Sequence, residues 1–246
     1  MRSNALLAIT ALGIWLTTRG QVNSNQTSSA GTVAAGIQKG DEAAILEAGS
    51  SGDSSFVPQL RALQGKPGKY VNLRVIQLAL ARLGQTDQLQ EIRCEALFGS
   101  ASVQYDAVSD KLKYVGGWFS IDSIAFLLDN ANYRGARRDG RGLFQPMGIY
   151  AVRTLPAIIP NPPEISAAMM VPGSAQEMQR ERAWKDWIEA HKDSLSKIAP
   201  SAAGVETSSQ VCRKVLKHDR TFDHKAIKDG SGDVGVVPCP KAGCSK

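Results

Sequence analysis

The sequence predicts an all-α fold over residues 41–198, and three observations support this prediction. Apolar residues recur at the three- and four-residue spacing that places them on one face of a helix, as in Phe56, Val57, Leu60 and Leu63. Glycine and proline residues separate these stretches at short intervals, where helices commonly end. Sustained alternation of β-branched with polar residues, which is typical of strands, does not occur in this part of the sequence. Strands are therefore not expected there.

Seven or eight helices joined by short turns account for this pattern. The expected helical stretches lie near residues 41–48, 54–63, 70–83, 89–97, 103–112, 118–128, 147–158 and 174–198. Ser54 or Ser55 is expected to cap the second stretch, and Ser120 is a possible cap near the start of the sixth. The stretch 70–83 is apolar over most of its circumference, which predicts burial between neighbouring helices. A polar loop, residues 130–142, separates the sixth stretch from the seventh.

Two segments together resemble one unit of the HEAT-like (armadillo-type) α-helical repeat family. In residues 52–63 a first helix opens near a Pro-x-Leu element, and residues 71–84 form an Ala- and Leu-rich second helix that ends in Leu-Gly. Residues 114–121 and 150–159 resemble a further, diverged unit, and residues 184–192 resemble the closing helix that follows such repeats. The resemblance implies a short α-solenoid of stacked helix pairs over residues 41–199. Because one pair cannot bury its apolar face alone, neighbouring pairs stack and leave an extended surface for partners.

The first 21 residues have the pattern of a secretory signal peptide. Arg2 precedes a mostly apolar run of twelve residues, Ala5 to Leu16. Twelve helical residues span about 18 Å, which is too short for a bilayer core of about 30 Å but fits the apolar part of a signal peptide. We expect an exported protein of a bacterial type, periplasmic or secreted, without stable membrane insertion after cleavage. Residues 22–40 are expected to form a flexible polar linker. The alternative for the leader is an uncleaved anchor helix or an ordinary core helix.

Residues 200–246 are expected to form a largely irregular tail that contains three of the four cysteines. In an oxidising compartment an even number of cysteines is typical of disulfides. Three pairings are possible, and a pair of Cys212 with Cys239 or Cys244 is favoured because a tail without a core gains most from a cross-link. For Cys94, the alternative to a disulfide is a free, buried cysteine on a helix. A disordered tail that only tethers the helices is a further possibility. The Cys and His spacings in this tail do not match a zinc motif, so no metal site is expected.

The sharpest local feature of the sequence is the polar loop, which carries Arg134, Arg137, Arg138 and Arg141 among glycines. Guanidinium groups of this kind bind phosphates, carboxylates or an acidic protein surface. The alternative is a solvated loop that Asp139 partly neutralises. This loop is the first candidate for a site that binds an anion or an acidic partner.

The sequence favours a non-enzymatic role. Motifs such as Gly-x-Ser-x-Gly, a phosphate-binding glycine loop and His-Glu-x-x-His do not occur, and no cofactor is implied. His191 and the tryptophans Trp118, Trp184 and Trp187 are expected to pack between helices. Aromatic residues make up only 6 % of the chain, which argues against a base-stacking surface for single-stranded nucleic acid. No helix concentrates cations as in a DNA-binding protein, so nucleic acid is not expected as a partner. We expect a scaffold that binds another protein in the periplasm or cell envelope. The alternative is an enzyme or accessory subunit that acts on an anionic substrate near residues 130–142.

Overall fold

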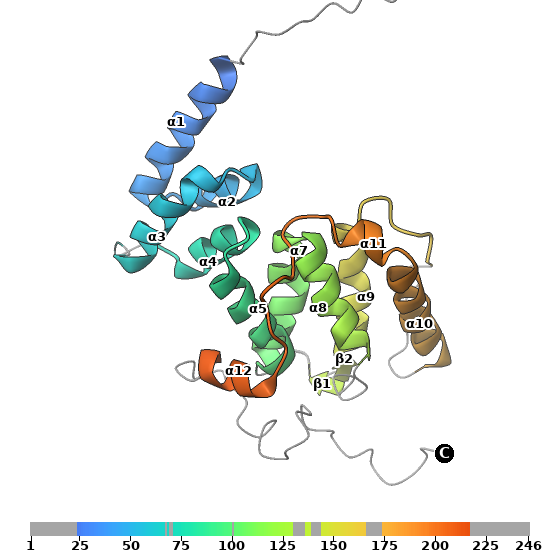
Figure 1. Cartoon of the computed structure of the whole chain (residues 1–246). Coiled ribbons are helices and arrows are strands. Elements are labelled where there is room, and N and C mark those ends of the chain that lie inside the picture. The colour runs from blue at the N-terminus through green and yellow to red at the C-terminus, as the bar shows by residue number, and fades with distance from the viewer. Residues whose placement is uncertain are drawn as a thin grey trace, which may run out of the picture.

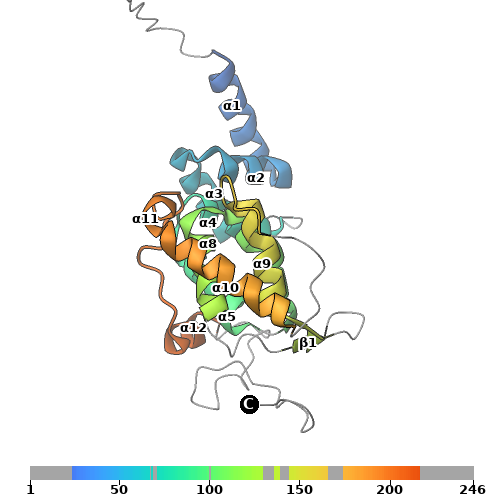
Figure 2. The same cartoon turned by 90° about the vertical axis from the view of Figure 1, so that its right-hand side faces the viewer.

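The computed structural model describes residues 24–66, 68, 71–99, 101–129, 136–138, 144–165 and 174–216. The predicted all-α class is confirmed, because helices make up nearly all the regular structure of these residues. The expected signal peptide, residues 1–21, lies outside them. Figures 1 and 2 show the helices as two groups, with α1 projecting from the smaller, N-terminal group.

The N-terminal group contains α1 (Ser24–Lys39), α2 (Glu42–Ser51), the short 3₁₀ helix η1 (Ser54–Phe56), α3 (Val57–Gly65) and α4 (Leu73–Arg82). The larger group contains α5 (Thr86–Phe98), α6 (Ala101–Asp106), the π-helical turn η2 (Ala107–Lys111), α7 (Leu112–Val115), α8 (Gly117–Asp129), α9 (Met147–Ile158), α10 (Ala175–Ala190), α11 (Lys192–Leu195) and α12 (Ser209–Val215).

Several helix ends follow local sequence signals. Asp41, Asp53 and Asn72 each accept a hydrogen bond from the backbone two residues on, and so begin α2, η1 and α4. The expected cap at Ser54 or Ser55 is therefore replaced by Asp53. Ser120 is also not a cap, because α8 begins earlier and buries this residue in its interior.

The prediction of a flexible linker over residues 22–40 is wrong, because most of this segment forms helix α1. Residues 24–39 are helical, and α1 packs on α2 and α3. Val33 and Ile37, one turn apart, are buried in the N-terminal core. The prediction failed because these two side chains stand among small polar residues, so the surrounding composition resembles a linker. Contact with α2 supplies the stabilisation that the isolated segment lacks.

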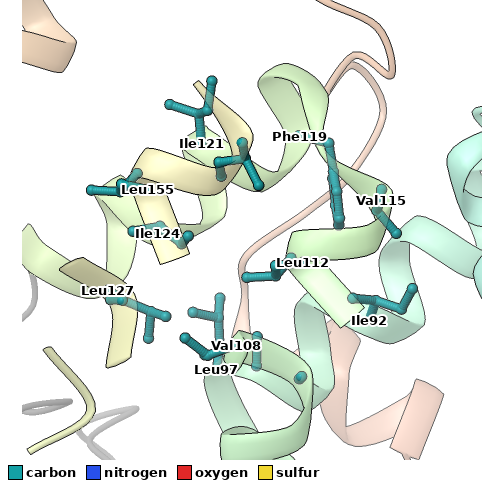
Figure 3. Close-up of a cluster of buried hydrophobic side chains, with 14 of the residues drawn as sticks. Ile92, Leu97, Val108, Leu112, Val115, Phe119, Ile121, Ile124, Leu127 and Leu155 are labelled. Carbon is teal, nitrogen blue, oxygen red and sulfur yellow. The ribbon is translucent and has the colours of Figure 1, made fainter. Parts of the chain in front are cut away.

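Helix α4 belongs to both cores, as its apolar circumference predicted. Ile76 and Leu80 are buried in the N-terminal core, whereas Leu78 and Ala81 lie in the larger one. The larger core centres on α8, whose Ile121, Ile124 and Leu127 lie near α9 and the π-helical turn in Figure 3.

Tyr114 of α7 connects the two groups. Its phenol donates a hydrogen bond to the carbonyl of Leu46 on α2, at 2.7 Å. A Cβ at Gly49, on the same helix, would lie 2.6 Å from the phenol oxygen, so glycine is needed for this approach. Arg82 of α4 donates to the carbonyl of Tyr114, and its guanidinium lies 5.2 Å from the ring centroid. The contact therefore joins α2, α4 and α7.

The connection between α8 and α9 contains two short strands, β1 (Ala136–Arg138) and β2 (Phe144–Pro146). They pair antiparallel, with Arg137 opposite Gln145. These two strands are the exception to the expectation that strands are essentially absent from residues 41–198. Each has three residues, too few for the alternation by which a strand is recognised in a sequence.

The end of the described chain returns to the larger group of helices. After α11, residues 196–208 run along the helices without regular structure and lead to α12, which packs on α5 (Figure 1). The predicted irregular tail from residue 200 onward is therefore wrong for α12, while residues 217–246 lie outside the described residues.

Candidate functional site

The structure describes two of the four arginines that the sequence singled out. Arg137 and Arg138 belong to β1, whereas Arg134 and Arg141 lie outside the described residues. β2 continues directly into α9, so the hairpin is attached to a helix at a fixed position. Figure 1 shows both strands below α8 and α9.

Helix α10 contacts the last residue of α8 and the first turn of α9, the two helices that precede and follow the hairpin in the sequence. The ammonium of Lys185 lies 2.5 Å from Oδ1 of Asp129, the last residue of α8. One turn earlier on α10, Glu181 lies against Gly148, where any Cβ would overlap its Oε1 atom. Lys185 and Glu181 are four residues apart and so lie on one face of the helix. α10 therefore holds together the end of α8 and the start of α9, the helices on either side of the hairpin in the sequence.

Two buried carboxylates lie on this face of α10. Glu177 is 3 % exposed and Glu181 is 2 % exposed. Glu181 meets α9 in its first turn, where the helix dipole stabilises a negative charge. A basic hairpin and buried acidic groups thus occur at the same end of the molecule. The sequence reasoning missed the two glutamates, because i, i+4 carboxylates on an amphipathic helix look like an ordinary solvated face.

A second buried polar cluster lies between α4, α5 and the π-helical turn. The ammonium of Lys111 is 2.7 Å from Oε2 of Glu95 and 3.1 Å from Oε1 of Gln77. Lys111 is 5 % exposed and Glu95 is 6 % exposed. Burial of both charges is tolerated because each neutralises the other and hydrogen bonds are made. The cluster fixes the π-helical turn relative to α4 and α5.

Arg93 of α5 holds α8 in a similar way. Its guanidinium pairs with Asp122 and donates from Nε to Oγ of Ser123 at 3.1 Å. The guanidinium also lies 5.4 Å from the ring centroid of Phe119. These three partners occupy one surface of α8. Arg93 is 3 % exposed, which assigns it to the support of the fold and not to a solvent-facing site.

Cys212 forms a disulfide with Cys94, across a sequence separation of 118. The predicted pairing of Cys212 with Cys239 or Cys244 is therefore wrong, as is the alternative of a free Cys94. Cys239 and Cys244 themselves lie outside the described residues. The pairing could not be read from the sequence because it depends on the return of the chain to α5. Both bonded cysteines are fully buried.

The aromatic residues of α8 and α10 divide between core and surface. Trp184 is fully buried, and Trp118 and Trp187 pack against the same core while half-buried, in line with the predicted packing role. His191 is exposed, at the C-terminal end of α10. Its ring stacks on Trp187 with 4.2 Å between the centroids, and Nδ1 lies 2.8 Å from the Trp187 carbonyl. The histidine therefore caps the helix end and does not pack between helices as expected.

Within the described ranges, no group of three or more His, Cys, Asp or Glu side chains is placed to hold a metal ion. Among the same residues, no helix is both long enough and apolar enough to cross a membrane. The fold and the site define a disulfide-linked, all-helical protein with a basic hairpin at one end. Comparisons of the chain with protein-family models, with curated proteins and with solved structures find no match.

Proposed function

We propose that this chain is an exported, non-enzymatic binding protein that presents its arginine-bearing hairpin to an acidic surface of another protein. The observation that carries the proposal is that α10 packs against both helices on either side of the hairpin. α10 contacts both Asp129 and Gly148, so the segment that contains the four arginines starts and ends on packed helices. A fixed base lowers the entropy that is lost when the arginines bind a partner.

Guanidinium groups favour carboxylates because they form paired, charge-assisted hydrogen bonds. An acidic protein surface offers many such acceptors. The helices behind the hairpin would serve as a rigid support, which we propose to be a short HEAT-like solenoid. This arrangement needs no reacting group in the hairpin itself.

Export to the periplasm or cell envelope is supported by the Cys94–Cys212 disulfide. Disulfides persist in oxidising compartments and are rare where thiols are kept reduced. The first 21 residues, which have the pattern of a signal peptide, also support export.

The binding proposal is tested by affinity capture from cross-linked envelope extract of the source cells. Three forms of the full chain are compared: wild type, a variant with the four hairpin arginines changed to alanine, and a charge-matched control. The arginine variant carries Arg134→Ala, Arg137→Ala, Arg138→Ala and Arg141→Ala. The control removes four exposed lysines, by Lys39→Ala, Lys113→Ala, Lys197→Ala and Lys214→Ala.

The arginine variant should lose its partner by about tenfold or more, and the control should lose less than about twofold, because only close charge pairs contribute strongly to affinity. Raising the salt concentration should weaken the wild-type complex. Circular dichroism of each variant checks that the helices are intact. Equal capture of the same proteins by wild type and by the arginine variant would refute the role of the hairpin.

Export is tested separately by the thiol state of the chain in its own cells. In a Cys239→Ser/Cys244→Ser background, acid quenching at harvest followed by alkylation of the denatured chain, which exposes both buried cysteines, should leave Cys94 and Cys212 unmodified. A form without residues 1–21 should be alkylated at both. Alkylation of both cysteines in the form with its leader would contradict export.

A further inference from the structure

The segment that follows α11 attaches to the helices at two separate places. We call residues 198–216 the C-terminal strap. Its near end lies on the start of α8, where the amides of Trp118 and Phe119 donate to the carbonyls of Ile198 and Pro200 at 2.9 and 3.0 Å. A Cβ at Gly117 would overlap the carbonyl of Ala199, so the strap lies directly on the helix backbone.

The far end of the strap, residues 206–216, is held mainly at α5. The Gln90 side chain donates from Nε2 to the carbonyl of Glu206 and accepts from its amide, both at 2.8 Å. Beyond this contact, Cys212 and Leu216 are the buried residues of the far end. Arg213, Lys214 and Val215, which lie between them, are exposed.

These contacts are too few to hold the far end without the covalent bond. Ordering residues 206–216 costs about 1–2 kcal/mol of backbone entropy per residue. Against this cost stand the seven-residue helix α12, its packing on α5 through Cys212 and Leu216, and two exposed hydrogen bonds, and a helix this short is marginal on its own. The Cys94–Cys212 bond offsets the remaining entropy cost, because it keeps the far end close to α5 whether or not the other contacts are made.

Gln90 also covers the disulfide. Its Nε2 atom lies 3.3 Å from Sγ of Cys94, and both cysteines are fully buried. A reductant therefore reaches the sulfur atoms only after the far end has opened locally. The same side chain that clamps Glu206 thus controls access to the bond.

We infer that Cys94–Cys212 is a redox latch: the disulfide holds residues 206–216 on α5, and the Gln90 side chain covers it.

The reductant that opens the latch is a dithiol, either a small molecule or a pair of thiols on a protein. One of its thiolates attacks a sulfur of the disulfide and forms a mixed disulfide, while the other cysteine leaves as a thiolate and is protonated. The second thiol of the reductant then displaces the bound cysteine. Two electrons pass to the pair, Cys94 and Cys212 become thiols, and the reductant becomes a disulfide. The far end, which includes α12, then leaves α5, while the other helices and the near end stay in place.

The latch is tested by hydrogen exchange of the full chain in the Cys239→Ser/Cys244→Ser background, so that only one disulfide is read. Exchange is followed by mass spectrometry for the oxidised protein, for the protein held in dithiothreitol, and for the Cys94→Ala/Cys212→Ala variant. Reduction should raise amide exchange over residues 206–216 by at least about tenfold. Exchange over α4 and α8 should change by less than about twofold.

Equal protection of residues 206–216 before and after reduction would overturn the latch, because the bond would then be passive. Loss of protection over α4 and α8 as well would also overturn it, since the bond would then support the whole fold.

The covering role of Gln90 has its own readout. Gln90→Ala should speed reduction by dithiothreitol by about fivefold or more, because the closed state loses its clamp. Gln38→Ala, an exposed glutamine on α1, is the matched control and should leave the rate unchanged. An unchanged rate in Gln90→Ala would refute the covering role.

Discussion

The ammonium of Lys111 lies 2.7 Å from a carboxylate oxygen of Glu95, and both side chains are buried in the helical core. The pair joins α5 to the π-helical turn, and Gln77 extends it to α4. A buried pair of this kind is costly to break, because removing one member leaves the other charge without compensation.

Lys111→Met should therefore lower the free energy of unfolding by about 3–5 kcal/mol, as measured by urea denaturation. The double variant Lys111→Met/Glu95→Met should cost less than the sum of the two single changes, since no unpaired charge remains. Lys113→Met, two residues away but exposed, should change stability by less than about 0.5 kcal/mol. Equal effects of Lys111→Met and Lys113→Met would show that the buried pair is not formed.

Gly117 is expected to be far less tolerant of a side chain than Gly84, although both have positive φ angles, of 63° and 79°. At Gly84 an added Cβ meets no atom within 4 Å, so Gly84→Ala should cost only the left-handed conformation, about 1–2 kcal/mol. At Gly117 the Cβ overlaps the backbone of Ala199 and Pro200 as well, which should add about 1–3 kcal/mol. Thermal denaturation of both variants measures the difference. Similar losses would mean that the strap does not lie on α8.

Asp87 should make the free energy of unfolding depend on pH in the acidic range. Its hydrogen bonds from Arg61 lower the pKa of this carboxyl to about 2. A lowered pKa in the folded state stabilises the protein above the unfolded pKa of about 3.9, and this stabilisation is lost as the pH falls through about 2. The Asp87 side chain is 57 % exposed, so the pair should contribute no more than about 1 kcal/mol.

At neutral pH the free energy of unfolding of Asp87→Asn should thus be lower than that of wild type, by no more than about 1 kcal/mol. This difference should narrow between about pH 4 and pH 2. Urea denaturation at each pH measures the gap. In an Arg61→Gln background the same substitution should have little effect. A gap that persists unchanged in that background would exclude the Arg61 contact as its cause.

Tyr114→Phe should weaken the contact between the two groups of helices. It removes the hydrogen bond to Leu46, and the loss should be about 1 kcal/mol at neutral pH. Burial raises the pKa of the Tyr114 phenol in the folded protein. The wild type should therefore lose part of this advantage as the pH rises above about 10, where the unfolded tyrosine ionises first.

Urea denaturation at neutral and alkaline pH follows this difference, with Tyr105→Phe as a control because Tyr105 is 46 % exposed. If Tyr105→Phe were as costly as Tyr114→Phe, the Leu46 contact would not explain the loss.

Helix positions were the part of this structure that local patterns predicted best. The Phe56, Leu60 and Leu63 spacing indicated α3, and Gly84 indicated the end of α4. These signals act within one or two turns, so they are present in the order of the residues. α1 escaped prediction because only Val33 and Ile37 mark its buried face, and a face of two residues is indistinguishable from chance.

The candidate site was predictable only in its most local part. Four arginines in eight residues stand out in the printed sequence, whereas Glu181 and Gly148 are 33 positions apart and become related only when α10 packs on α9. The hairpin strands were missed for the same reason, since the helices at either end decide that the two segments meet.

By itself, the sequence determined the helical class, the approximate ends of most helices and the basic loop, because helix periodicity, capping and charge are properties of neighbouring residues. Only the tertiary structure decided that Cys94 pairs with Cys212, that Gln90 clamps Glu206 and that Lys111 is buried with Glu95. Each of these contacts depends on how the helices pack. Packing follows from the burial of many apolar side chains at once, so no single spacing in the chain records it.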